Sequence, residues 1–264
     1  MKFTKMQGLG NDYIYVFGNP PENVKELSIK LSDRHFGIGS DGMVFITPSI
    51  KGDFGMRIFN ADGSEAMMCG NGIRCVAKYL YEKGYTDRRD IGIETLSGVK
   101  NIHMDVTAGK VAAVGVNMGK SAVSEEVRLF VCGKEVLLTP VNMGNPHAVL
   151  FVDDAENAPL CTVGKALEKH EYFPGGTNVE FARILAEDKI RMRVWERGSG
   201  VTLACGTGAC AVTAAAVARG YCRAGSPVSV VLDGGELQII VNNDKTVYMR
   251  GPAEFVFEGE IKEC

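Results

Sequence analysis

Two segments of the chain are apolar around nearly the whole circumference of a helix. Residues 209–218 read ACAVTAAAVA, and residues 73–80 are nearly as apolar. A helix without a polar face must be buried on all sides, so each segment is predicted to be the central helix of its own core. A basic residue followed by glycine ends each pattern, at Lys83 and Gly84 and again at Arg219 and Gly220. This is a typical helix C-terminus.

Short β-rich runs separated by Gly, Asp, Asn and Lys turn signals fill much of the remainder. The predicted strands are residues 13–17, 43–47, 54–59, 91–95, 111–116, 148–152, 190–195, 228–232, 237–241 and 255–257. Two further helices are predicted, one from Pro21 to about Arg34 and one over about 160–170. The pattern predicts an α+β fold of two similar halves, each a curved, mostly antiparallel sheet wrapped around a central helix.

An internal repeat supports two halves. The segment 10–13 matches 144–147 at an offset of 134 residues, 41–45 matches 178–181 at 137, and 68–72 matches 204–208 at 136. Three matches in one order at nearly one spacing indicate duplication. We expect a first half over residues 1–117, completed by a C-terminal strand within 251–264, and a second half over 118–250.

Composition narrows the function classes. The chain has 264 residues, 45% of them hydrophobic, and a net charge of −3. It shows no basic stripe, apolar leader or long apolar run, so we expect a soluble cytoplasmic protein that binds neither nucleic acid nor membrane. Its eight cysteines lack zinc-site spacing, and a disulfide framework does not suit a reducing compartment.

Two cysteines, Cys69 and Cys205, open the two central helices. A helix N-terminus presents unpaired N–H groups and a positive dipole end, which we expect to lower the thiol pKa and to hold a carboxylate. Inverting a carbon stereocentre requires a base on one face and an acid on the other. Two matched thiols beside one carboxylate suit that reaction.

Further motifs lie in matched places. Asn60 and Glu196 each stand nine residues before their cysteine. The chain resembles diaminopimelate epimerase over nearly its whole length, through seven motifs in family order: GLGNDY (8–13), FNADGSEAMMCGNGIRC (59–75), ETLSG (94–98), MGNPH (143–147), GTNVEF (176–181), WERGSG (195–200) and ACGTGAC (204–210).

The resemblance implies interconversion of LL- and meso-diaminopimelate, for lysine and peptidoglycan synthesis, without pyridoxal phosphate, metal or another cofactor. It implies a site in the cleft between two pseudo-symmetric domains. It also implies that the thiol pair can close into an inactive disulfide.

Carried over by position, the resemblance assigns roles to particular residues. The acid–base thiols fall on Cys69 and Cys205, flanked by His147 and Glu196, which would help to set their protonation. Arg197, beside Glu196, would hold the distal carboxylate. The substrate-binding asparagines fall on Asn11, Asn60, Asn145 and Asn178. Backbone N–H groups of Gly70, Asn71, Gly206 and Thr207 would bind the reacting carboxylate.

One position departs from part of the family. Some members have a substrate-contacting Gln where this chain has Gly42.

Three alternatives remain from the residues alone: a racemase for proline, hydroxyproline or histidine, a phenazine-type isomerase, and a non-catalytic binder of dicarboxylic amino acids. Arg197 favours a dicarboxylic substrate over a monocarboxylic one, and the paired thiols disfavour the other two. A homodimer is expected because twofold assemblies are the commonest.

Overall fold

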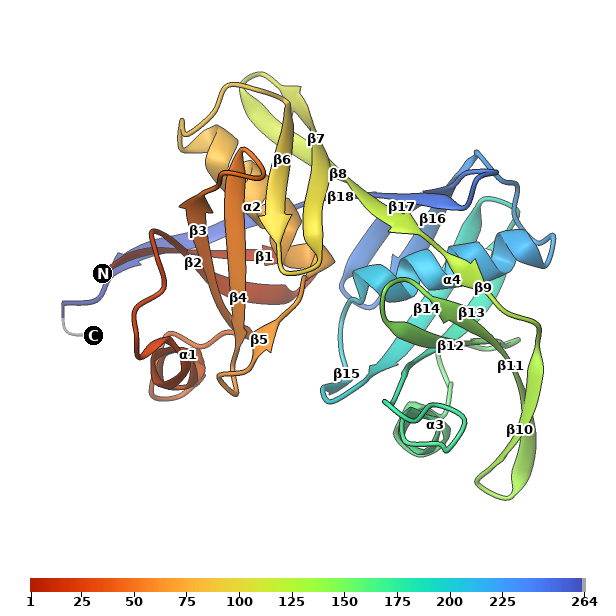
Figure 1. The fold of residues 1–264 in the computed structure, drawn as a ribbon. Coiled ribbons are helices and arrows are strands. Elements are labelled where there is room, and N and C mark those ends of the chain that lie inside the picture. Colours follow the sequence, from red (N-terminus) through yellow and green to blue (C-terminus); the bar gives the residue numbers. More distant parts are fainter. Residues whose placement is uncertain (263–264) are drawn as a thin grey trace. The chain divides into compact units, whose positions relative to one another are not determined.

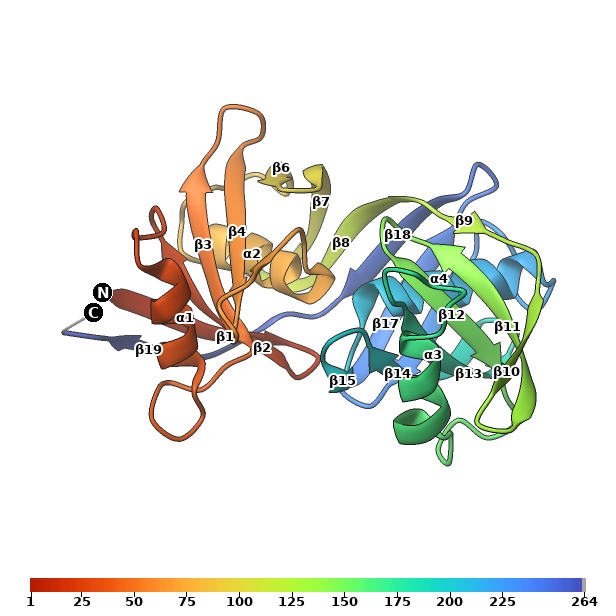
Figure 2. The ribbon, with the colours of Figure 1, turned by 60° about the horizontal axis from the view of Figure 1, so that its bottom comes forward.

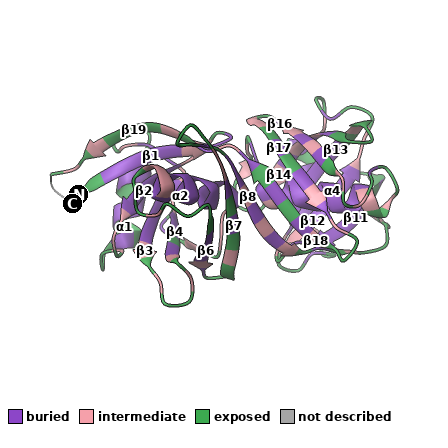
Figure 3. Ribbon diagram, turned by 90° about the horizontal axis from the view of Figure 1, so that it is seen from above, coloured by how far each residue is buried: buried purple, intermediate pink, exposed green. Residues whose placement is uncertain are grey.

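The two apolar segments form helices that begin next to the two cysteines. In the computed structural model, which describes residues 1–262, α2 spans Gly70–Glu82 and α4 spans Gly206–Ala218. Both end as the sequence predicts, since Gly84 and Gly220 follow them with φ of 77° and 76°. Every residue of α2 from Gly70 to Leu80 is buried, and α4 is buried along most of its length (Figure 3).

The described chain divides into two compact units. Unit 1 is Met1–Val116 together with the segment from Gly251, and unit 2 is Asn117–Arg250. Glu263 and Cys264, which are predicted to belong to the first half, lie outside the described residues. In Figure 1, α2 lies among the strands of unit 1 and α4 among those of unit 2, and Figure 2 shows the same arrangement from another side.

Unit 1 is a sheet with two parallel pairings, β2 with β3 and β4 with β6, among otherwise antiparallel neighbours. Its pairing order is β19-β1-β2-β3-β4-β6-β7-β8, with β5 beside β4. The strands are β1 (Lys2–Gly8), β2 (Asn11–Phe17), β3 (Gly42–Pro48), β4 (Phe54–Asn60), β5 (Glu65–Ala66), β6 (Asp90–Thr95), β7 (Gly98–Thr107), β8 (Lys110–Lys120) and β19 (Glu254–Glu260).

Unit 2 repeats this topology. Its order is β9-β11-β12-β13-β14-β16-β17-β18, with β10 beside β11 and β15 beside β14, and β12 with β13 and β14 with β16 are the parallel pairs. The strands are β9 (Ala122–Val123), β10 (Val127–Val131), β11 (Lys134–Asn142), β12 (Pro146–Phe151), β13 (Asn178–Ala186), β14 (Lys189–Glu196), β15 (Gly200–Val201), β16 (Pro227–Leu232), β17 (Gly235–Val241) and β18 (Thr246–Gly251). The α+β fold predicted from the sequence is therefore confirmed.

Each sheet is covered on both faces, which explains why its central strands are continuously apolar. In β2, Ile14 and Val16 pack with α1 (Val24–Ser32), and Tyr13 and Tyr15 alternate with them on the opposite face. Since side chains of a strand alternate between faces, this opposite face is the one that α2 covers. A central strand of this kind carries no polar face that could reveal its alternation in the sequence.

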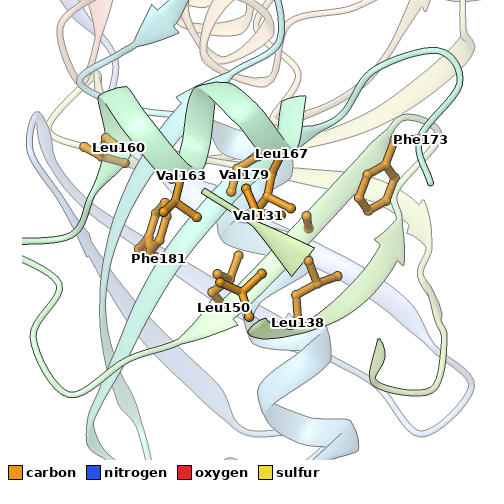
Figure 4. Packing of buried hydrophobic residues seen from close by; sticks show 11 residues of the cluster. Val131, Leu138, Leu150, Leu160, Val163, Leu167, Phe173, Val179 and Phe181 are labelled. Carbon is orange, nitrogen blue, oxygen red and sulfur yellow. The ribbon is translucent and has the colours of Figure 1, made fainter. Parts of the chain in front are cut away.

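The outer face of unit 2 is covered differently. Here the predicted helix over 160–170 begins as a π-helical turn, η1 (Leu160–Gly164), and continues as the short α3 (Lys165–Glu168). Figure 4 shows Leu160, Val163 and Leu167 packed toward Leu150 and Phe181 of the sheet. Gly164 permits this close packing, because a Cβ there would lie 3.0 Å from Cβ of Trp195.

All ten strands predicted from the sequence are present, several of them extended by one to four residues. The first predicted helix is shorter than expected, Val24–Ser32. In the described residues, no helix is long and apolar enough to cross a membrane.

Candidate active site

Each candidate thiol is the N-cap of its helix. Cys69 has extended backbone angles (φ −134°, ψ 119°), and its Sγ accepts a hydrogen bond from the backbone N–H of Gly72 at 3.4 Å. Cys205 repeats this geometry (φ −119°, ψ 110°), with Sγ accepting from the N–H of Gly208 at 3.3 Å. The sulfur therefore takes the place of the oxygen with which Ser or Asp usually caps a helix.

Asn11 is the polar neighbour of Cys69. The Cys69 thiol donates to Asn11 Oδ1 at 3.3 Å, while Asn11 Nδ2 donates to Asp41 Oδ2 at 2.7 Å. Asp41 thus fixes the direction of the Asn11 amide and turns its oxygen toward the thiol. Tyr13 lies nearby on β2; burial, followed by the charge of Cys69, raises its pKa well above the ordinary value.

Asn60 is less closely tied to Cys69. It ends β4 opposite Gly42, and its Nδ2 donates to Ser64 Oγ at 3.0 Å. Its side chain is engaged with the turn that follows β4, so its predicted role in substrate binding stays a proposal. Gly70 and Asn71 form the buried first turn of α2.

Two carboxylates lie close enough to Cys205 to affect its thiol, in addition to the helix N-terminus. Burial and the carboxylates of Glu196 and Glu180 raise the pKa of the Cys205 thiol well above 9, although Thr207 and the Gly208 N–H act in the opposite direction. The N–H at the helix terminus thus lowers this pKa as expected, but burial and the two carboxylates outweigh it, so the expected net lowering is wrong for Cys205. Burial likewise raises the pKa of Glu196, whose Oε1 accepts from the Thr202 hydroxyl.

His147 lies in a buried cluster on the face of the sheet opposite η1 and α3. Its Nδ1 is 2.7 Å from Glu180 Oε1, and its Nε2 is 3.1 Å from Asn145 Oδ1. Both His147 and Glu180 have completely buried side chains. The ring therefore bridges Glu180 and Asn145. Asn145 Nδ2 in turn donates to Thr207 Oγ1 at 3.4 Å, which connects the cluster to the first turn of α4.

Glu180 was given no role in the sequence analysis, although it lies in the GTNVEF motif. The repeat contains the signal that was missed. The structure aligns β3 with β13 at an offset of 136 residues, not 137, because Val44 pairs with Ile58 and Glu180 pairs with Val194. Glu180 therefore replaces an apolar residue, Val44, of the other unit.

The same alignment corrects the partner of Asn178. At an offset of 136 its counterpart is Gly42 rather than Asp41. Gly42 is thus the unit 1 equivalent of a polar unit 2 position.

Asn178 and Arg197 form a third group, at the ends of β13 and β14. Asn178 Oδ1 accepts from the Arg197 backbone N–H at 2.9 Å. The exposed Arg197 side chain donates from Nη1 to the Gly175 carbonyl at 2.8 Å. Gly176 leaves room for it, because a Cβ there would lie 2.9 Å from Arg197 Cδ. The guanidinium is therefore held in a defined direction and still exposed to solvent.

Within unit 1, hydrogen bonds join Asn11 to Cys69, and Asn60 lies apart. Within unit 2, Asn145, His147, Thr207 and Cys205 are linked to one another, and Glu196 lies within their electrostatic reach. In unit 1 Asn11 contacts the thiol directly, and in unit 2 Asn145 is linked to the thiol through Thr207.

Comparisons with known proteins agree along the whole chain. A sequence model described as diaminopimelate epimerase matches residues 3–123 and 139–256. A diaminopimelate epimerase of Methanococcus maripaludis is 51% identical, with 99% of both chains covered. Another, of Phocaeicola vulgatus, is 52% identical, with 99% of this chain and 98% of the relative covered.

Among solved structures, a PhzF-family phenazine biosynthesis protein of Bacillus anthracis has the same fold. Its TM-score is 0.79 at 16% identity, with 99% of this chain and 98% of that chain covered.

Proposed function

Because the chain belongs to the diaminopimelate epimerase family, we propose that Cys69 and Cys205 are the acid–base pair with which it interconverts LL- and meso-diaminopimelate. The chain is an isomerase, and its reaction belongs to lysine biosynthesis. What is proposed here is the set of residues that performs the reaction.

One observation supports this pair above the others. Both units contain a cysteine N-cap whose sulfur accepts an N–H from the third residue of a buried helix. An asparagine stands at matched places, with Asn11 at the start of β2 and Asn145 just before β12. A packing role for one cysteine would not require its cap geometry and its asparagine to be repeated.

In the proposed reaction, one cysteine is a thiolate and the other a thiol. The thiolate removes the α-proton, and the electron pair left at Cα delocalises into the α-carboxylate. The thiol then donates its proton to the opposite face of Cα. The original thiol is thereby a thiolate and the original thiolate a thiol, so the pair is poised for the reverse direction. This requires the thiols to meet the substrate from opposite faces.

The α-carboxylate gains negative charge when the proton leaves, and it needs donors that are already in place. The first backbone N–H groups of a helix have no partner within the helix. We assign this role to Gly70 and Asn71 of α2 and to Gly206 and Thr207 of α4. Two helix dipoles then act on the developing charge.

The distal end of diaminopimelate carries a second carboxylate and a second amino group. Arg197 is proposed to bind that carboxylate, since its guanidinium is held by Gly175 but remains exposed. Asn60, Asn145, Asn178 and Glu196 offer amide and carboxylate groups for the ammonium and carboxylate positions. His147 and Glu196 are proposed to set the protonation of Cys205.

The test is proton NMR of LL-diaminopimelate in D2O with reduced protein and no added cofactor. Loss of the α-proton signal with appearance of the meso isomer is expected. Cys69→Ala and Cys205→Ala should each abolish epimerisation, while Cys161→Ala, at an exposed thiol, should not. Turnover that persists in either of the first two variants contradicts the two-thiol assignment. If folded wild-type protein does not react with diaminopimelate, the substrate assignment is wrong. Proline, hydroxyproline and histidine would then be assayed.

A further inference from the structure

Glu180 is a completely buried carboxylate that the proposed reaction does not use. It lies on β13, and its Oε1 is 2.7 Å from His147 Nδ1. Its second oxygen, Oε2, is buried with no hydrogen-bond partner among the described residues. Burying a carboxylate is costly even when it is paired, so its retention here needs a reason.

The carboxylate lies against the first turn of α4. A Cβ on Gly208 would lie 2.7 Å from Glu180 Oε1 and 3.2 Å from Cys205 Sγ. The thiol and the carboxylate thus share the space beside one glycine. On α2, the equivalent Gly72 has the flexible end of Met56 as its nearest neighbour, at 3.4 Å from such a Cβ.

A series of polar contacts leads from Glu180 to the thiol. His147 Nε2 is 3.1 Å from Asn145 Oδ1, Asn145 Nδ2 is 3.4 Å from Thr207 Oγ1, and Thr207 Oγ1 is 3.6 Å from Cys205 Sγ. Glu180 is the buried end of this series. A displacement of the His147 ring would therefore be transmitted to Thr207 and to the thiol.

The fold itself does not require this pair. In unit 1 the positions equivalent to His147 and Glu180 are Tyr13 and Val44, and the same strands form in the same register. An aromatic and an aliphatic residue are therefore sufficient to build this layer. The imidazole–carboxylate pair is present only on the side of Cys205.

We propose that Glu180 is a positioning residue for Cys205: it holds the His147 ring, and through Asn145 and Thr207 it fixes the direction in which Cys205 exchanges its proton. The inference rests on the proposed function, since it concerns the same thiol. It makes the two half-sites unequal, because a buried imidazole–carboxylate pair stands in one unit where Tyr13 and Val44 stand in the other.

A double-mutant cycle tests the proposal, with Glu180→Gln, His147→Asn and the combined variant. Glu180→Gln should lower kcat by about 10- to 100-fold, the cost of a slightly misplaced reacting group, with KM changed by less than about twofold. Because Glu180 positions the thiol through His147, adding Glu180→Gln to His147→Asn should cause no further loss of kcat. Glu187→Gln removes the same charge at an exposed site and should leave kcat unchanged.

Unchanged kcat in Glu180→Gln, or a further loss when it is added to His147→Asn, would overturn the proposal. Folding is checked by fluorescence of Trp195, the one tryptophan of the sequence, and by the unfolding midpoint. If Glu180→Gln does not fold, Glu180→Val introduces the residue of the equivalent position, and the same kcat loss is expected.

A readout independent of turnover separates this inference from the proposed function. The ring ¹⁵N signals of the chain's four histidines can be compared between wild type and Glu180→Gln. The His147 signals should shift and the other three should not. If the His147 signals do not shift, the inference is wrong even when the wild type is active. If the wild type has no epimerase activity, the proposed function is wrong instead.

Discussion

Two glycines at the third position of the central helices differ in how much room they have. At Gly208 a Cβ would lie 2.7 Å from a carboxylate oxygen and 3.2 Å from the thiol, and the carboxylate is completely buried. At Gly72 the nearest atom is a methionine methyl at 3.4 Å. Glycine at position 208 is therefore needed so that the carboxylate and the thiol can lie close to the helix backbone. At position 72 a small side chain could replace it.

Gly208→Ala should destabilise the protein by about 1–3 kcal/mol, the usual cost of overpacking, and should reduce activity. Gly72→Ala should change stability by less than about 1 kcal/mol, because alanine also favours the helix. Urea unfolding of both variants measures the difference. Equal effects would mean that the space beside Gly208 is not restricted by Glu180.

Arg197 can be tested through binding. Arg197→Met should raise KM for diaminopimelate about 10-fold and leave kcat nearly unchanged. A hydrogen bond to a charged group contributes about 1.5 kcal/mol to binding, and its loss corresponds to that change in KM. Arg183→Met, at an exposed position on β13, is the matched control. An unchanged KM would assign the distal carboxylate to another residue.

The proposed acid–base residues could be predicted from the sequence better than their surroundings. Cys69 and Cys205 were found because the repeat and the helix starts coincide in one dimension. Glu180 was missed because its role depends on a neighbouring strand and on the glycine beside it, which only the folded chain brings together. The raised pKa of Cys205 was missed for the same reason, since burial and two carboxylates outweigh the helix terminus.

At the scale of elements, the helices and the half-buried strands were predictable, and strands with ambiguous patterns were not. β7 contains Lys100, Asn101, His103 and Asp105, which are poor strand formers. It becomes a strand because β6 and β8 pair with it on both sides. β11 was not predicted, and it includes Pro140, a residue that cannot donate a ladder hydrogen bond. Tertiary pairing outweighed local propensity in both.

The two central helices also end in the same way, each followed by a glycine with a left-handed backbone. The stability cost of replacing that glycine can be measured. Gly84 and Gly220 both have φ near 77°, and a Cβ on either would meet no atom within 4 Å. Alanine at either position should therefore cost only the left-handed backbone strain, about 1–2 kcal/mol, without loss of activity. Chemical denaturation of Gly84→Ala and Gly220→Ala measures it. A much larger loss in one variant would contradict their equivalence.

At the scale of the whole molecule, buried thiols make stability depend on alkaline pH. Burial raises the pKa of Cys75 from 9.0 to about 11. In the unfolded chain this thiol loses its proton from about pH 9, whereas in the folded chain it keeps it until about pH 11. Its contribution is therefore complete below pH 9 and is lost as the pH rises toward 11.

A shift of this size corresponds to at most about 3 kcal/mol for Cys75. Urea unfolding at pH 8, 9.5 and 10.5 should show stability falling with pH, and less steeply in Cys75→Ala. Cys161→Ala, at an exposed thiol, should keep the wild-type slope. A wild-type slope in Cys75→Ala would show that other groups cause the loss.

Oxidation provides a test of the two units acting together. If both thiols act on one substrate carbon, mild oxidation should join Cys69 to Cys205 and abolish activity, and a thiol reductant should restore it. Mass spectrometry would identify the linked peptides. A Cys132→Ser, Cys161→Ser variant lacks the two thiols that are exposed within residues 1–262 and should be inactivated equally. If it resists oxidation, the exposed cysteines cause the inactivation.

The pairing of β1 with β19 has a consequence for the order in which the protein is made. Unit 2 is one continuous stretch, Asn117–Arg250, whereas unit 1 requires the strand Glu254–Glu260 beside its first strand. On the ribosome, the second unit can therefore complete its sheet before the first one can. β1 is synthesised first but cannot pair with β19 until the end of the chain has been made. Until then the edge of β1 is open to incorrect partners.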